Sequence, residues 1–180
     1  MIAKGIHSSA TIECLGEAVI PETTILEPQA VIYTGPISRL VIGEMFTMYP
    51  HSSIRLEKGW LEIGYEVSLG PGTHIYESRA GMIIGNNVLI AGGCLFSGTS
   101  HGMADNGVPM RRQPFSAKPI LIEDDVWIGM HCTVLPGVTI GRGAVVGAGS
   151  LVTNDLPPGM ICFGSPCKPV RARPNQSIIQ

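Results

Sequence analysis

IEDDVWIGMHCTVLPGVTIGRGAVVGAGSLVTNDL, residues 122–156, repeats one pattern every six residues. Steps of six meet a β-branched aliphatic residue each time: Ile122, Ile128, Val134, Ile140, Val146 and Val152. The residue four places after each of these is mostly small: Val126, Cys132, Val138, Ala144, Ser150 and Leu156. An α-helix repeats about every 3.6 residues and a strand about every two, so neither explains a period of six over this length.

The same period extends upstream and predicts the fold. The frame continues as Ile84, Ile90 and Phe96, as Ile63, Leu69 and Ile75, as Ile42, Met48 and Ile54, and more loosely as Ile25, Val31 and Ile37. Ile42, Ile63 and Ile84 are 21 residues apart, which is three hexads plus three residues each time. A short strand followed by a corner gives such a period, and three hexads close one triangular coil. The sequence therefore predicts an all-β protein, a parallel β-helix whose hexapeptide repeat covers roughly residues 19 to 156.

Length and composition indicate a single domain. The 180 residues are 44% hydrophobic, as in a globular protein with one core. We expect one β-helix domain over residues 1–173, with an inserted loop at about 97–119 and a short closing segment at about 157–173, followed by a tail at 174–180. Charged residues make up 14%, the net charge is -2, and Lys and Arg are scattered, so nucleic acid is not an expected partner.

The sequence also gives expectations about location. Its first residues lack an apolar segment of signal-peptide length, and no tract of about twenty predominantly apolar residues occurs. We therefore expect a cytoplasmic protein without an integral membrane segment. The five cysteines are odd in number and lack a C-x-x-C pair, so we expect free thiols.

The period breaks between Phe96 and Ile122, which are 26 residues apart where six are expected. About twenty residues are therefore inserted at a corner of the predicted β-helix. The inserted segment carries His101, Asp105, Arg111, Arg112 and Lys118, and its net charge is +2 with histidine neutral. Long loops in compact domains are often functional, so the break predicts a site.

The C-terminal half of the repeat resembles a known family. Residues 122–170, with the motifs DDVWIG, PGVTIG and GSPCKP, resemble the last coils and closing segment of the hexapeptide-repeat acyltransferases, which include maltose, xenobiotic and polysaccharide O-acetyltransferases. The resemblance implies a left-handed coil, a homotrimer, and acetyl-CoA as co-substrate in a groove between subunits. A bare β-helix of this size suits the members that acetylate sugars or surface polysaccharides.

The same resemblance implies a catalytic residue. In these enzymes a histidine near the start of a similar loop is the general base, which corresponds to His101 here. Transfer from a thioester to a hydroxyl requires a proton to leave the attacking group, and imidazole accepts it near neutral pH. His74, from the preceding coil, is a candidate for contacting the acceptor. Asp105, Arg111 and Arg112 are further substrate-binding candidates, and the arginine pair would favour an acidic sugar unless it is simply solvated.

Residues for acetyl-CoA follow from the family as well. The expected contacts are Trp127, Gly129, Gly147, Thr153, Lys168 and Arg171. Trp127 occupies an outward hexad position, where packing between subunits is the alternative explanation. Lys168 and one arginine of the pair Arg171 and Arg173 would face phosphate groups, with a solvated basic tail as the alternative. Backbone N–H groups at a glycine-rich turn are expected to hold the oxyanion.

We therefore expect an acetyl-CoA-dependent O-acetyltransferase that acts by direct transfer to a small-molecule or polysaccharide acceptor. An N-acetyltransferase of an amino sugar or antibiotic and a non-enzymatic β-helix scaffold stay open as alternatives. No metal is expected, because a zinc carbonic anhydrase on this repeat needs three converging histidines, two of them five residues apart, and no two histidines here have that spacing. His7, His51 and His131 are expected at the surface, and Trp60 is expected to pack at a corner.

Overall fold

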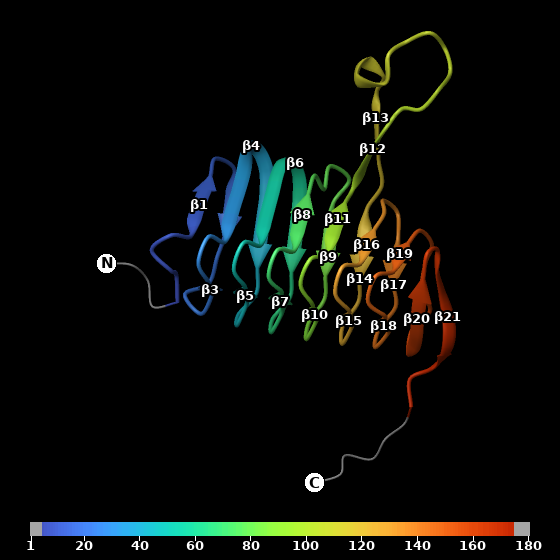
Figure 1. Ribbon diagram of the computed structural model, residues 1–180. Coiled ribbons are helices and arrows are strands. Elements are labelled where there is room, and N and C mark those ends of the chain that lie inside the picture. The colour runs from blue at the N-terminus through green and yellow to red at the C-terminus, as the bar shows by residue number, and fades with distance from the viewer. Residues whose placement is uncertain (1–4, 175–180) are drawn as a thin grey trace.

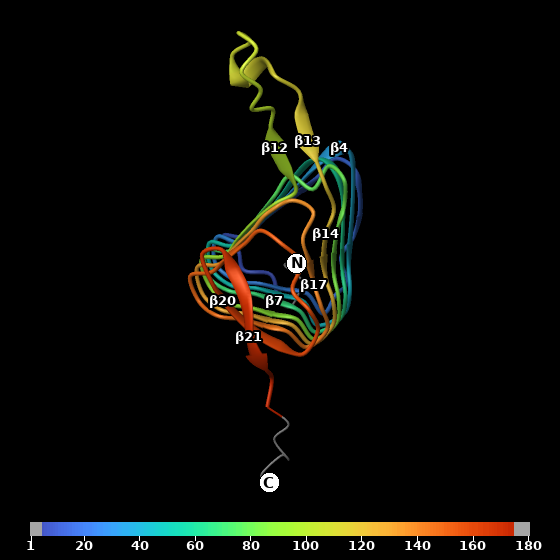
Figure 2. The same cartoon turned by 90° about the vertical axis from the view of Figure 1, so that its right-hand side faces the viewer.

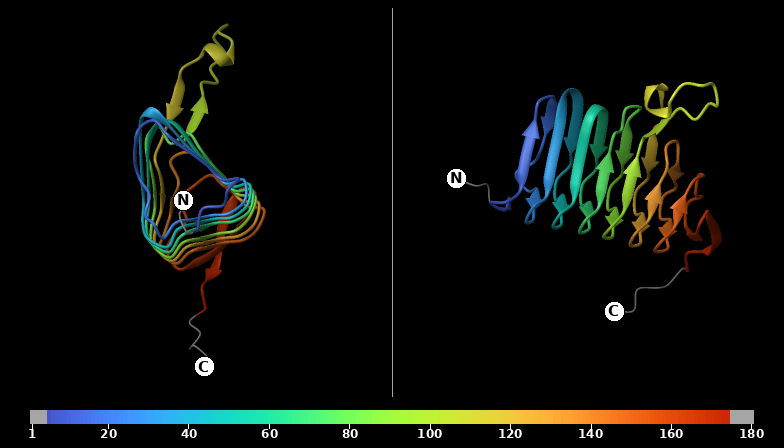
Figure 3. Two further views of the ribbon diagram at one scale, coloured as in Figure 1. Left: turned by 90° about the vertical axis from the view of Figure 1, so that its left-hand side faces the viewer. Right: turned by 45° about the horizontal axis from the view of Figure 1, so that its top comes forward.

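The computed structural model describes residues 5–174 and shows a left-handed parallel β-helix (Figure 1). Each coil has three sides, which we name faces A, B and C in chain order, and the coils stack along one axis (Figure 3). Seen from the C-terminal end, the chain passes from face A through B to C in a clockwise sense as it approaches the viewer (Figure 2). The predicted fold class is therefore confirmed, including the coil sense that the family resemblance implied.

Short strands in register form the three faces. Face A contains β3 (Ile25–Leu26), β5 (Thr47–Met48), β7 (Ser68–Leu69), β10 (Leu89–Ile90), β15 (Trp127–Ile128), β18 (Val145–Val146), β20 (Met160–Gly164) and β21 (Cys167–Ala172). Face B contains β1 (Thr11–Cys14), the first parts of β4 (Val31–Ile42) and β6 (Ser53–Ile63), β8 (His74–Tyr76), β11 (Leu95–Ser97), β16 (Thr133–Val134) and β19 (Leu151–Val152). Face C contains β2 (Glu17–Val19), the last parts of β4 and β6, β9 (Met82–Ile84), β14 (Ile120–Ile122) and β17 (Thr139–Ile140). All pairings within the stack are parallel except that of β20 with β21.

Each face contributes one ladder of inward side chains to the core, and further buried side chains, such as Phe46 and Val126, pack beside these ladders. On face A the ladder is Leu26, Met48, Leu69, Ile90, Ile128, Val146 and Cys162. On face B it is Ile32, Ile54, Ile75, Phe96, Val134 and Val152. On face C it is Ile42, Ile63, Ile84, Ile122 and Ile140. Each of these side chains is at most 4% exposed, and full burial stabilises the fold by roughly 1.5–3 kcal/mol for each large aliphatic or aromatic one.

The frame predicted for the first coil is wrong by one residue. Ile25 is 44% exposed and Ile37 is 69% exposed, whereas Leu26 and Ile32 are completely buried. Successive side chains of a strand point to opposite sides, so a shift of one residue exchanges the inward and outward sets. Pairing with the next coil decides the register here, because it aligns Leu26 and Ile32 with the ladders of faces A and B.

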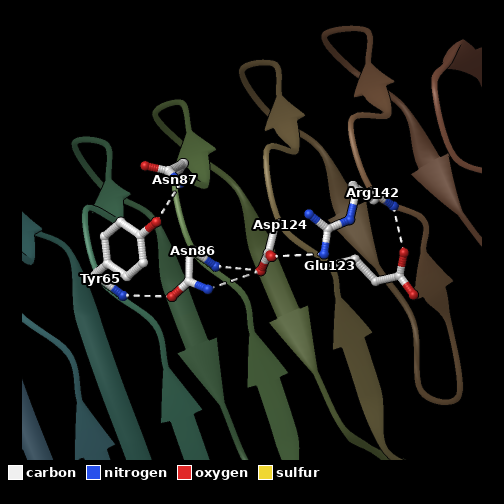
Figure 4. Close-up of polar contacts among 6 residues, drawn as sticks. All are labelled: Tyr65, Asn86, Asn87, Glu123, Asp124 and Arg142. Atoms are coloured by element: carbon white, nitrogen blue, oxygen red, sulfur yellow. Dashed lines mark hydrogen bonds and ion pairs between the residues drawn. The ribbon is translucent and has the colours of Figure 1, made fainter.

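The corner between faces C and A is tight and is linked from coil to coil by polar side chains (Figure 4). One residue per coil adopts the left-handed backbone region there, with φ between 56° and 68°: Met45, Glu66, Asn87, Asp125 and Gly143. The Asn86 side chain accepts a hydrogen bond from the Tyr65 N–H at 3.1 Å, and the Asp124 carboxylate accepts one from the Asn86 N–H at 2.8 Å. Arg142 continues the series with an ion pair to Asp124 at 2.9 Å. These bonds satisfy backbone groups that the sharp turn leaves without strand partners.

The corner between faces B and C departs from the hexad. Ladder residues that flank it are nine positions apart in two coils, as in Ile54 to Ile63 and Ile75 to Ile84, and the 26-residue break lies at the same corner. The inserted segment is an ordered arm, formed by the antiparallel strands β12 (Thr99–His101) and β13 (Phe115–Ala117) and the 3-10 turn η1 (Met110–Arg112). The arm projects away from the coils in Figures 1 and 2.

Gln113 holds the outer part of this arm together. Its side chain is nearly buried, and its Nε2 donates hydrogen bonds to the carbonyls of Ala104 at 2.9 Å and Val108 at 2.8 Å. Its Oε1 accepts a hydrogen bond from the N–H of Ala104 at 3.0 Å. Beyond the backbone bond from the Gly102 N–H to the Pro114 carbonyl, this one amide side chain therefore takes over from the strand ladder.

The remaining expectations concern the chain end, the cysteines and Trp60. The hairpin β20–β21 forms the closing segment, while residues 175–180 of the expected tail lie outside the described residues. All five cysteines are free, as expected. Trp60 packs at the corner between faces B and C, where its ring occupies the space beside Gly81. No helix within residues 5–174 is both long enough and apolar enough to span a bilayer.

Candidate active site

His101 is the last residue of β12 and is presented by the arm beside the irregular corner. It lies opposite Phe115 in the register of the two arm strands. The two rings pack at a centroid distance of 4.2 Å with an interplanar angle of 48°. The imidazole is exposed on one side and supported by an aromatic ring on the other, which suits a base that must meet a ligand from solution.

A pocket of about 330 Å³ contains His101. Its walls are Glu57, Tyr76, Glu77, Arg79, Ser97, Thr99, Ser100, His101 and Phe115. Glu57, the segment 76–79 and the segment 97–101 come from three successive coils at the same corner. The extra residues that break the hexad there therefore supply the walls, and the longest insertion supplies the histidine.

A buried carboxylate forms the floor of the pocket. The Glu77 side chain is 7% exposed and pairs with Arg79 at 2.8 Å. Its other oxygen accepts a hydrogen bond from the Glu57 N–H at 3.2 Å. Arg79 also lies over the Phe115 ring, with its guanidinium carbon 4.7 Å from the ring centroid. Each charge in the floor thus has a partner, as a buried ion pair requires.

A second hollow, of about 530 Å³, surrounds Trp127 at the start of face A. It is lined by Asn87, Leu89, Asp125, Val126, Trp127, Val145, Ile161 and Arg173. Trp127 is 51% exposed, and Arg173 is held at 2.7 Å from the Asp125 carboxylate. An exposed indole in a mainly apolar groove with an arginine at its edge fits a ligand that carries both apolar and phosphate groups.

Face A collects most of the residues predicted to contact acetyl-CoA. Trp127, Val145, Ile161 and Arg171 lie side by side across β15, β18, β20 and β21. Gly129 and Gly147 follow the same strands β15 and β18, and Lys168 lies opposite Phe163. Thr153 lies apart, after β19 on face B, where its hydroxyl accepts a hydrogen bond from Asn154 at 2.9 Å.

Two of these residues have a structural function that the sequence did not reveal. The Gly129 N–H donates to the Val146 carbonyl at 2.8 Å, and the Gly147 N–H donates to the Cys162 carbonyl at 2.7 Å. A Cβ at Gly129 would lie 2.7 Å from the Ala148 nitrogen, so the neighbouring coil excludes a side chain there. Both N–H groups are engaged in the stack, and an oxyanion would need other donors.

The predicted substrate-binding residues do not gather around His101 within one chain. His74 is on β8, two residues before Tyr76, and its Nδ1 lies 2.8 Å from the Ser53 hydroxyl. Asp105, Arg111 and Arg112 are exposed in the outer part of the arm. None of these four lines the His101 pocket formed by the described residues. Their contact with an acceptor stays a prediction.

Sequence reasoning missed the residues that complete both hollows. Around His101 these are Glu57, Tyr76, Glu77, Arg79 and Phe115, and in the Trp127 groove they include Asp125 and Val145. The 21-residue spacing carried a signal for this first group except Phe115, because it indicated three extra residues in each coil and these lie at one corner. Phe115 belongs to the inserted arm. The basic closing segment pointed to Arg173 as well, and the path of the chain after β21 brings it to Asp125.

The predicted base and the predicted acetyl-CoA face lie on different sides of the chain. β12 projects from the corner between faces B and C, while β15 belongs to face A on the other side of the triangle (Figures 1 and 2). A single chain therefore does not bring His101 and Trp127 to one place.

Comparisons with known proteins agree with this architecture. Residues 119–154 match the family described as bacterial transferase hexapeptide (six repeats). The galactoside O-acetyltransferase of Escherichia coli K12 is 36% identical over 126 residues, which cover 64% of this chain and 61% of that protein. The chain spans about half the length of the curated relatives it matches.

Two solved structures share the fold. An N-acyltransferase from Bacillus cereus, in complex with an amino-sugar nucleotide and coenzyme A, superposes with a TM-score of 0.74 at 19% identity, covering 97% of this chain and 86% of the other. A polysialic acid O-acetyltransferase superposes with a TM-score of 0.64 at 18% identity, covering 95% and 94%.

Proposed function

We propose that this chain, which is similar to the hexapeptide-repeat transferases, moves an acetyl group from acetyl-CoA to a hydroxyl of a sugar or surface polysaccharide. The observation that carries the proposal is His101, an exposed imidazole in a polar pocket lined by hydroxyl-bearing side chains. The relative from Escherichia coli and the polysialic acid enzyme both carry names of sugar O-acetyltransferases, which supports a sugar acceptor.

His101 is the general base of this reaction. Its imidazole removes the proton from the acceptor hydroxyl as the hydroxyl oxygen attacks the acetyl carbonyl, and general-base help of this kind contributes about 10²- to 10⁴-fold. The thioester supplies an activated acetyl group whose thiolate departs, and the proton held by His101 is available to neutralise it. The products are the acetyl ester of the acceptor and free CoA, so no covalent enzyme intermediate is required.

Face A is the binding surface for acetyl-CoA. The groove around Trp127 has an apolar floor for the pantetheine portion, and Arg173 lies at its edge. Lys168 and Arg171, exposed on β21 at the end of the same sheet, are placed to meet phosphate oxygens. The residues present therefore fit the co-substrate.

The active enzyme is a homotrimer, and each site combines two chains. Since His101 and Trp127 lie on different sides of one chain, the arm of one protomer must meet face A of its neighbour. Cyclic oligomers place different surfaces of identical chains together in this way. The free cysteines support a reducing compartment, and we infer that the enzyme acts in the cytoplasm.

Calorimetry and an activity assay test the proposal. Acetyl-CoA should bind the purified protein, and thiol release should depend on a sugar acceptor. His101→Ala should lower turnover at least a hundredfold, about the lower limit of general-base help, while acetyl-CoA affinity changes little. Absence of acetyl-CoA binding at millimolar concentration would favour the scaffold alternative, and an unimpaired His101→Ala variant would remove His101 from the role of base.

An amine acceptor is the second candidate. The pocket contains the carboxylates of Glu57 and Glu77, which would favour an ammonium group, and the Bacillus cereus neighbour is named an N-acyltransferase. Each of these carboxylates already pairs with an arginine, Glu57 with Arg55 and Glu77 with Arg79, so a neutral hydroxyl acceptor is favoured. Parallel assays with matched sugars that carry a hydroxyl or an amine at one position distinguish the two.

A further inference from the structure

We infer that Glu77, Arg79 and Phe115 form a clamp that fixes the imidazole of His101 in its working position. The inference rests on the proposed role of His101 as base. The three residues connect the body of the β-helix to the arm through consecutive contacts. They are positioning residues, since their contacts act through His101 and not on the reacting atoms.

Glu77 anchors the clamp in the body. Its side chain is 7% exposed, and its carboxylate is held by both Arg79 and the Glu57 N–H. Its own carbonyl accepts a hydrogen bond at 2.9 Å from the N–H of Gly98, the residue that precedes β12. One residue therefore fixes the foot of the arm by its backbone and orients Arg79 by its side chain.

The backbone of Glu77 forms a sharp turn. Its φ is 52°, in the left-handed region, which costs a residue with a Cβ roughly 1–2 kcal/mol. Corner residues of other coils, such as Met45 and Glu66, adopt the same region, so this conformation belongs to the turn and persists because surrounding contacts determine it. The strained turn directs the carboxylate inward beneath Arg79.

Arg79 transmits the anchor to the arm. Its Nε is bound to Glu77, and its guanidinium lies over the Phe115 ring at 4.7 Å. A guanidinium over an aromatic face contributes about 0.5–1 kcal/mol where solvent reaches it, and more where it does not. Arg79 is 33% exposed, so the contact is partly shielded.

Phe115 completes the path to the base. It faces His101 across the two strands of the arm, with ring centroids 4.2 Å apart. A cross-strand aromatic pair contributes about 0.5–1.5 kcal/mol beyond its buried area. With Arg79 also against its ring, Phe115 links the imidazole to a side chain of the rigid stack.

The arm needs such a link because an isolated pair of strands is only marginally stable in water. A general base must lie within about 2.6–3.2 Å of the group it deprotonates. A misplacement of about 1 Å can cost on the order of a hundredfold in rate. The clamp provides the stiffness that the exposed arm lacks.

Matched substitutions test the clamp. Phe115→Leu keeps an apolar side chain but removes the ring, and its control, Phe115→Tyr, keeps the ring. Arg79→Met removes the charge, and its control, Arg79→Lys, keeps it. We expect Phe115→Leu and Arg79→Met to lower kcat about tenfold, a part of the roughly hundredfold effect of a 1 Å misplacement, while KM for acetyl-CoA stays within about twofold. Phe115→Tyr should retain most of the wild-type activity. Phe115 is 48% exposed, so the melting temperature of the Phe115→Leu protein should hardly change.

A loss of kcat in Phe115→Tyr as large as in Phe115→Leu would overturn the clamp, and so would an unchanged kcat in both Phe115→Leu and Arg79→Met. A second readout is independent of catalysis, namely the NMR signals of the His101 ring. Arg79→Met should shift these signals, because Arg79 lies against the Phe115 ring that packs on the imidazole. Unchanged signals would count against the clamp. If His101→Ala is fully active but Arg79→Met moves the imidazole signals, the proposed function has failed while the clamp has not.

Discussion

Mixing two inactive variants gives the sharpest test of an active site shared between chains. His101→Ala removes the base and leaves face A intact, while Trp127→Ala impairs face A and leaves the base intact. In the proposed trimer, each site takes His101 from one chain and Trp127 from its neighbour. A site in a mixed trimer is therefore complete when a Trp127→Ala chain provides the arm and a His101→Ala chain provides face A.

The expected magnitude follows from random mixing. With equal amounts of the two variants, the chance that one chain supplies an intact arm is about one half, and the same holds for face A of its neighbour, so about a quarter of the sites are complete. That share includes the trimers of a single variant, which have no complete site. Every mixed trimer has one complete site in three, so isolated mixed trimers should show about a third of the wild-type turnover, well above either variant alone. A site built within one chain would give no gain on mixing.

The assay co-expresses the variants with different tags, isolates doubly tagged oligomers, and measures acceptor-dependent thiol release. Light scattering on each single variant checks that it keeps the wild-type oligomeric state. Arg171→Glu serves as a second face A variant if Trp127→Ala changes assembly. Activity of the mixed oligomers no greater than the mean of the two variants would refute the reasoning that different chains supply the base and the acetyl-CoA face.

Three further predictions concern the fold. Gly129→Ala should destabilise the protein by about 1–3 kcal/mol through overpacking against the next coil, measured by chemical denaturation. A Cβ at Gly149 would have no atom within 4 Å, so Gly149→Ala should cost only the left-handed backbone strain of roughly 1–2 kcal/mol. A loss below about 1 kcal/mol in Gly129→Ala would argue against close coil contact. Gln113→Ala should leave backbone groups unpaired, at a cost of about 1–3 kcal/mol that is confined to the arm. Protease cleavage within 102–114 should therefore accelerate while the melting temperature of the whole protein stays constant. A fall in that melting temperature would contradict an independent arm. Ellman's reagent should titrate one thiol, that of Cys14, in the folded protein and five thiols in guanidinium. The other four cysteines are buried, and burial raises the pKa of the Cys162 thiol. Rapid reaction of several thiols in the folded protein would contradict their burial in the core.

The sequence by itself determined the coil and most of its core. In a parallel β-helix, neighbours in space are equivalent positions of successive repeats, so a local period of six also describes the long-range contacts. This is why the hexad pattern alone identifies Ile122, Ile128 and Val134 as inward residues. The same logic failed in the first coil, where the pattern was weak and pairing with the next coil decided the register of Leu26 and Ile32.

Only the tertiary structure decided how the candidate site is built. The break in the repeat pointed to His101, but the walls of its pocket come from three coils that the sequence separates by about twenty residues each. Stacking places their extra residues at one corner, and it brings Glu77, Arg79 and Phe115 together behind the imidazole. The sequence also did not reveal that His101 and Trp127 lie on different sides of the chain. A period specifies which side chains point inward, but it does not specify from which corner an insertion projects or which chain completes the site.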